Sequence, residues 1–141
     1  VYCKGQAVYS WDPPYDLISE TDALIQQVSA INGNVLWQGV VGKAGDYTAT
    51  PPRLAVSDDG EEIYYLRPDG VYKINTRDPA ISASPLITGN FYGLDVNPED
   101  GNIFVFQASF TGNGTMKIYT SEGVLVSEGT VGIAPNGASF H

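Results

Sequence analysis

The side chains that most often carry catalysis are scarce in this sequence of 141 residues. His141 is its sole histidine and Cys3 its sole cysteine, so a Ser-His or Cys-His pair, a zinc site and an internal disulfide are not expected. Paired carboxylates could still hydrolyse a glycosidic bond, although no spacing singles out a pair. Four acids in the loops described below are candidates: Asp12, Asp16, Asp46 and Asp69. We therefore expect no catalytic residue, metal site or cofactor here, and any catalytic group of an enzyme would lie outside these residues.

Aromatic and cationic side chains between the apolar runs indicate binding instead. Aromatic rings on loops offer flat apolar surface, tyrosine adds a hydroxyl, and lysine or arginine can meet a carboxylate or phosphate. The candidate ligand-binding residues are Tyr15, Lys43, Tyr47, Arg67, Asn90, Phe91, Tyr92 and Phe110. The alternative is that Phe91, Tyr92 and Phe110 only fill spaces between packed sheets. Gly42–Gly45 lacks the spacing of a phosphate-binding loop.

The elements that must position these loops repeat along the chain. Leu54–Tyr65 and Leu94–Val105 both read as an alternating apolar strand, an acidic turn with glycine and an aromatic strand. Val35–Gly42 likewise parallels Val124–Gly132, about 90 residues away. Val71–Ile74 also matches Thr115–Ile118, so corresponding strands are offset by roughly 40 and 44 residues, close to the period of a β-propeller blade. The repeat therefore predicts an all-β chain of about three four-stranded blades.

Each unit divides into four expected strands, with blades at about 1–47, 48–90 and 91–136. The expected strands are Val1–Lys4 (unless this strand precedes the chain), Ala7–Trp11, Ala23–Ile31 and Asn34–Val41; then Arg53–Ser57, Ile63–Leu66, Val71–Ile74 and Ser84–Ile87; then Tyr92–Asn97, Asn102–Phe106, Thr115–Tyr119 and Val124–Val131. Gly137–Phe140 reads as the start of a further strand. Because closed rings normally need 4–8 blades, we expect this to be a segment of a larger propeller, completed by another fragment or copy. A compact sandwich is the structural alternative.

Strand alternation sorts the loops onto two faces of such a propeller. The turns after the first and third strands are tight and acidic, with Asp58, Asp59, Glu61, Glu62, Glu99, Asp100 and Glu122. They lack the spacing of a calcium loop and fit ordinary glycine-containing turns. The remaining loops carry the eight candidate binding residues, so we expect any ligand on that aromatic face.

Charge and hydropathy narrow the classes of partner. The formal net charge of −9 disfavours binding to nucleic acid or to anionic lipid. No apolar run approaches the ~20 residues that span a bilayer, and no secretory or lipidation signal is present. The expected partners are the remainder of the propeller and a small molecule or another protein.

The last third of the chain carries a recognisable pattern in Tyr92–Val105, Gly114–Tyr119 and Gly132–Pro135. It resembles the C-terminal part of the YncE-like (DUF5074-type) propellers of Bacteroidetes surface lipoproteins. The resemblance implies a seven- or eight-bladed ring outside the bacterial outer membrane. It also implies, from some relatives, capture of corrinoids such as vitamin B12 for a TonB-dependent transporter. The matching residues belong to the framework, so no binding residue is carried over.

Three hypotheses follow from these observations. The first is a non-catalytic, cell-surface propeller that captures a nutrient ligand on its aromatic face. The second is a protein-interaction or surface scaffold in which that face meets another chain. The third is a lyase or hydrolase of the same architecture with catalytic residues largely outside this segment.

Overall fold

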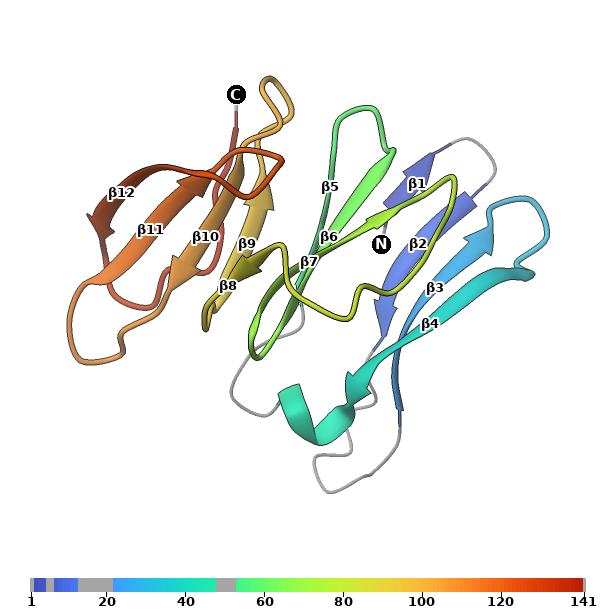
Figure 1. Cartoon of the computed structure of the whole chain (residues 1–141), viewed down its shortest axis with the longest axis horizontal. Helices are drawn as coiled ribbons and strands as arrows, with labels where there is room; N and C mark the ends of the chain where they lie inside the picture. Colours follow the sequence, from blue (N-terminus) through green and yellow to red (C-terminus); the bar gives the residue numbers. More distant parts are fainter. Residues whose placement is uncertain (1, 5–6, 13–21, 48–52, 141) are drawn as a thin grey trace.

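The computed structural model describes residues 2–4, 7–12, 22–47 and 53–140, and nearly all of its regular structure is β-strand (Figure 1). Twelve strands form three four-stranded antiparallel sheets, each with its strands paired in chain order. Among the described residues, no helix has the length and hydropathy needed to cross a membrane. The predicted all-β class is confirmed.

The three sheets use consecutive stretches of chain. The first sheet consists of β1 (Tyr2–Lys4), β2 (Ala7–Asp12), β3 (Asp22–Ser29) and β4 (Val35–Lys43), followed by the short 3-10 helix η1 (Ala44–Tyr47). The second consists of β5 (Leu54–Val56), β6 (Glu62–Arg67), β7 (Gly70–Asn75) and β8 (Ile87–Thr88). The third consists of β9 (Gly93–Val96), β10 (Ile103–Gln107), β11 (Gly114–Tyr119) and β12 (Leu125–Val131).

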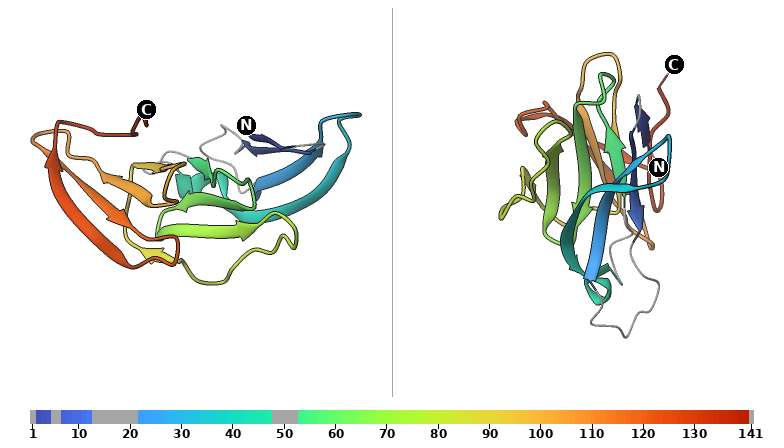
Figure 2. Two further views of the ribbon diagram at one scale, coloured as in Figure 1. Left: turned by 90° about the horizontal axis from the view of Figure 1, so that it is seen from above. Right: turned by 90° about the vertical axis from the view of Figure 1, so that its right-hand side faces the viewer.

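The second sheet is buried on both faces, which explains the uninterrupted apolar run in β6. Successive strand residues point to opposite faces. Ile63 and Tyr65 accordingly pack with residues of the first sheet, while Tyr64 and Leu66 pack with the third. All four side chains are at most 1% exposed. The sheets therefore stack face to face, and Figure 2 shows them side by side along an arc.

The third sheet is covered on its far face by the last described residues. The Ala138 backbone N–H donates to Asp95 Oδ2 at 2.6 Å, and the ring of Phe140 meets Phe104 edge-on with centroids 5.1 Å apart. A Cβ at Gly93 would lie 2.5 Å from the backbone of Asn136. Residues 135–140 thus lie against β9 and β10, although residues 137–140 pair in no strand.

Strand bounds agree with the sequence expectation to within two residues, except at β8. This strand begins at Ile87, three residues after the expected Ser84. Pro85 has no backbone N–H to donate to a ladder, and the Ser82 hydroxyl donates to the carbonyl of Ser84. The residues before β8 instead reach the first sheet, where Ile81 packs at Gly39.

Candidate functional site

The loops that carry the candidate binding residues lie at one end of the sheets, along the lower edge of Figure 1. We call this the aromatic end; it comprises η1, the β6–β7 turn (67–70), the β8–β9 connection (89–92) and the β10–β11 loop (108–113). Hydrogen bonds join its parts. The Gly89 N–H donates to the Asp69 carbonyl at 3.0 Å, and Gln107 Nε2 donates to the Asn90 carbonyl at 3.4 Å. These loops therefore form one continuous surface across the second and third sheets.

Arg67 is held at the end of β6 by an aromatic ring. Its guanidinium carbon lies 4.7 Å from the centroid of the Tyr72 ring, and Tyr65 stacks on that ring at 5.5 Å. The Tyr72 hydroxyl donates to Asp69 Oδ2 at 2.8 Å, while Asp69 Oδ1 stays 3.9 Å from Arg67 Nε. The turn thus combines a cation, a carboxylate and two tyrosine rings.

Tyr47 belongs to the core beside this cluster. It is 8% exposed, and its hydroxyl donates to the Val41 carbonyl at 3.0 Å. Burial raises the pKa of Tyr47 and of Tyr65 well above the ordinary value, and the nearby positive charge of Arg67 opposes that rise. Both hydroxyls therefore stay protonated at neutral pH. Tyr47 therefore supports the site as a core residue.

Phe110, which is exposed, and Tyr92, which is half-buried, form an aromatic pair at this end. Their rings meet edge-to-face with centroids 5.5 Å apart, and Phe110 is 68% exposed. Tyr92 is anchored by its N–H, which donates to the Phe106 carbonyl at 2.7 Å. Phe91 differs: it is 2% exposed and packs in the core between the second and third sheets. Asn90, which precedes Phe91, is exposed.

Lys43 lies at the first-sheet side of this end. Its Nζ is 2.6 Å from Asp22 Oδ1, and its backbone N–H donates to Asp46 Oδ2 at 2.8 Å. Two of the acids named as glycosidase candidates have structural roles. Asp46 accepts the Lys43 N–H at the β4–η1 turn, and Asp69 accepts the Tyr72 hydroxyl. Tyr15 and Asp16 lie outside the described residues, as does the side chain of Asp12. Among the described residues, no three metal-ligating side chains cluster.

The structure thus divides the eight candidates. It brings Arg67 together with Tyr47, and it brings Asn90, Phe91, Tyr92 and Phe110 together on adjoining loops, but Tyr47 and Phe91 are core residues. Sequence reasoning overlooked Tyr72, which orients Arg67. The Arg-Pro-Asp-Gly turn just before Tyr72 was a usable signal, because a two-residue turn places Tyr72 beside the strand that ends in Arg67.

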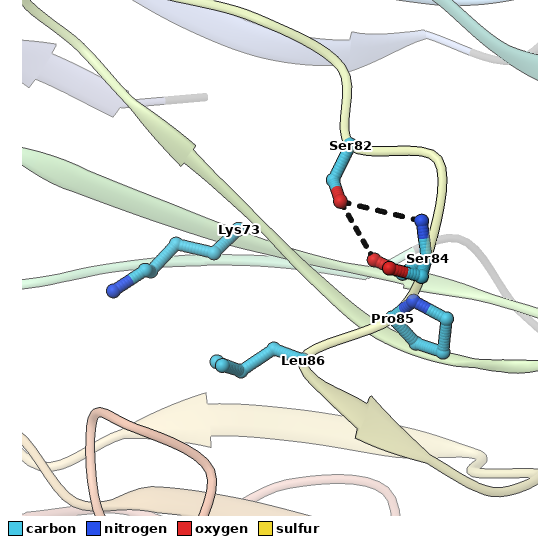
Figure 3. Close-up of a pocket in the computed structure, with 5 residues that line it drawn as sticks. All are labelled: Lys73, Ser82, Ser84, Pro85 and Leu86. Carbon is cyan, nitrogen blue, oxygen red and sulfur yellow. Dashed lines mark hydrogen bonds between the residues drawn. The ribbon is translucent and has the colours of Figure 1, made fainter.

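A pocket of about 310 Å³ lies beside the long β7–β8 connection (Figure 3). Its lining residues are Lys73, Ser82, Ser84, Pro85 and Leu86. Lys73 Nζ lies 2.9 Å from Glu62 Oε1, and the Ser82 hydroxyl donates to the Ser84 carbonyl at 2.7 Å. The side chains of Lys73 and Ser82 therefore already have partners within the protein.

The comparisons with known proteins bear on the fold. The chain matches no family model and no curated protein. Its structure is similar to the crystal structure of a protein of unknown function from Bacteroides caccae, with a TM-score of 0.53 and 16% sequence identity. The match covers 76% of this chain and 36% of that one, so this chain spans little more than a third of that protein's length. At this identity the likeness concerns the fold alone.

Proposed function

We propose that the three sheets are consecutive blades of a β-propeller. Each sheet is an antiparallel meander that packs face to face on the next, and the first strands β5 and β9 are in contact. A connecting hydrogen bond also recurs: the Gly89 N–H donates to the Asp69 carbonyl, and the Ala134 N–H donates to the Ser109 carbonyl. In both places the chain leaves the last strand of one sheet and crosses the loop between that sheet's second and third strands. Residues 135–140 then follow the path of a next first strand.

Further blades would cover the open parts of the stack. The far face of the third sheet carries Phe104, Met116 and Ile118, which are only half-buried by residues 135–140. Propeller blades normally bury such faces against a neighbour. The greater length of the similar Bacteroides caccae protein fits a larger ring. We therefore expect another part of a longer chain, or another copy, on each side.

The proposed activity of this propeller is non-catalytic ligand binding at the aromatic end. The observation that carries it is the exposure of Phe110, a large flat ring held edge-on to Tyr92 on a loop fixed by hydrogen bonds at Ser109. Such a ring contributes binding energy at low entropic cost. The resemblance to YncE-like surface lipoproteins adds the ligand class: a corrinoid captured outside the outer membrane for a TonB-dependent transporter.

Isothermal titration of the protein with cyanocobalamin tests this activity. We expect saturable binding that Phe110→Ala weakens by roughly two- to twelvefold, the worth of one aromatic contact of about 0.5–1.5 kcal/mol. Val124→Ala is the matched control, because Val124 is 62% exposed in the β11–β12 turn at the other end. Equal losses from both variants would place the contact elsewhere, and no binding by the wild-type protein would remove corrinoids as the ligand class.

A protein scaffold is the second candidate, favoured by apolar side chains on the two outermost strands. Val35, Leu36 and Val40 on β4 are 50–57% exposed, as are Leu125 and Val126 on β12. Exposed apolar clusters of this kind mark protein contacts. Native mass spectrometry of the wild type and of Leu36→Glu separates the candidates. A salt-insensitive assembly that the glutamate dissolves, with no cyanocobalamin binding, favours the scaffold.

A further inference from the structure

Among the ion pairs of the described residues, that of Arg67 with Asp69 is the longest. Among the cations whose side chains are described, Lys43, Lys73 and Lys117 lie 2.6–3.3 Å from a carboxylate oxygen. Arg77 is bonded to Glu61. Arg67 Nε, by contrast, is buried without a hydrogen-bond partner, and the nearest carboxylate oxygen is 3.9 Å away, beyond hydrogen-bond reach.

A buried N–H without an acceptor is unexpected in so acidic a chain, because it costs free energy. The sequence has sixteen acidic and seven basic residues, so carboxylate acceptors are numerous. Arg53 also has a buried Nε without an acceptor. Arg53, however, is close enough to Asp95 for its positive charge to oppose the rise in the pKa of that carboxyl. At the aromatic end, Arg67 is the described cation whose Nε has no hydrogen-bond acceptor.

The local geometry holds the Arg67 guanidinium in place. Its carbon lies 4.7 Å from the centroid of the Tyr72 ring, and this cation–π contact holds the group at the turn. Asp69 Oδ1 is 3.9 Å from Arg67 Nε, too far for a hydrogen bond, and Asp69 Oδ2 accepts from the Tyr72 hydroxyl. The side chain keeps 27% of its surface exposed. A planar, pre-oriented fork of N–H donors matches the two oxygens of a carboxylate or a phosphate.

We propose that Arg67 binds an oxyanion, a carboxylate or phosphate group, of the ligand held at the aromatic end. This inference rests on the ligand-binding function proposed above and adds the chemistry of one ligand group. Phe110 and Tyr92 meet the flat apolar part of the ligand, and Arg67, at the neighbouring turn joined through Gly89, meets its charge.

Nuclear magnetic resonance tests the proposal directly, because the chain has three arginines and each gives its own Nε–Hε signal. The protein is titrated with inorganic phosphate and, separately, with sodium acetate, against sodium chloride at matched ionic strength. We expect the Arg67 signal to shift saturably with one or both oxyanions. Arg77, which is paired with Glu61 and 75% exposed, should move only as it does in chloride. The two oxyanion titrations tell phosphate from carboxylate preference.

Variants give the second measurement, read at the backbone amides of Gly70 and Gly89. Arg67→Gln should abolish their saturable shift, and Arg67→Lys should weaken it at least about fivefold because an ammonium is a point charge without the fork. Arg77→Gln is the matched control and should change nothing. Equal shifts of Arg67 and Arg77, or unchanged oxyanion affinity in Arg67→Gln, would overturn the proposal.

The outcomes also separate this inference from the proposed function. Saturable oxyanion binding without cyanocobalamin binding keeps the Arg67 site and removes the corrinoid. Cyanocobalamin binding that is insensitive to Arg67→Gln, together with no shift of the Arg67 signal, removes the Arg67 site and keeps the corrinoid.

Discussion

The second and third sheets arise from similar sequence units yet differ in how much of each is buried. In β6, Ile63, Tyr64, Tyr65 and Leu66 are all at most 1% exposed, because a sheet packs on each face. In the outermost strand of the third sheet, Leu125 and Val126 are 50% and 57% exposed. The repeat sets which residues are apolar, and the neighbours decide which apolar residues become core.

Replacing a leucine in the second sheet and a leucine in the third should show the largest difference in the free energy of unfolding. Leu66→Ala removes a fully buried side chain and should lower the free energy of unfolding by about 2–5 kcal/mol. Leu125→Ala, at a half-exposed position on β12, should cost under about 1 kcal/mol. Chemical denaturation followed by tyrosine and tryptophan fluorescence measures both. Similar losses would mean that β12 is covered in solution, as a neighbouring blade or copy would cover it.

Two glycines sharpen the comparison within the third sheet. A Cβ at Gly93 on β9 would meet the Asn136 backbone at 2.5 Å, whereas a Cβ at Gly129 on β12 would meet nothing within 4 Å. Gly93→Ala should therefore cost about 1–3 kcal/mol through overpacking. Gly129→Ala should be neutral or slightly stabilising, since alanine restricts the unfolded chain. Thermal unfolding compares the two, and a harmless Gly93→Ala would show that residues 135–140 do not stay against β9.

The smallest expected effect concerns Asp95, which accepts a hydrogen bond from the Ala138 N–H within residues 135–140. Burial raises its pKa, and the Ala138 N–H and the Arg53 charge oppose that rise. A raised pKa in the folded protein means that Asp95 contributes stability below its unfolded pKa and loses it as pH rises through the folded value. The stability of Asp95→Asn relative to wild type should therefore increase across the mildly acidic range and then level off. Unfolding measured at several pH values checks this. Exposed Glu99→Gln is the control, and a flat Asp95→Asn difference would contradict the burial of Asp95.

The sequence predicted the strands well because their signals are local. Alternation of apolar residues and glycine-containing turns, repeated along the chain, located every strand, and only β8 begins more than two residues from its expected bound. The candidate site was predicted less well. Phe91 and Phe110 stand on neighbouring loops with the same residue type, yet one is 2% and the other 68% exposed. No local pattern separates them, because burial depends on the facing sheet.

By itself, the sequence determined the all-β class, the repeat and the loops that carry the candidate aromatic side chains. These follow from side-chain period and turn chemistry, which act over a few residues. Only the tertiary structure decided that Tyr47 and Phe91 are core, that Phe110 is exposed and that the Arg67 guanidinium lies over the Tyr72 ring, with no carboxylate within hydrogen-bond distance of its Nε. Those outcomes depend on distances between side chains that lie far apart in the chain or on different strands, and packing of the sheets alone sets such distances.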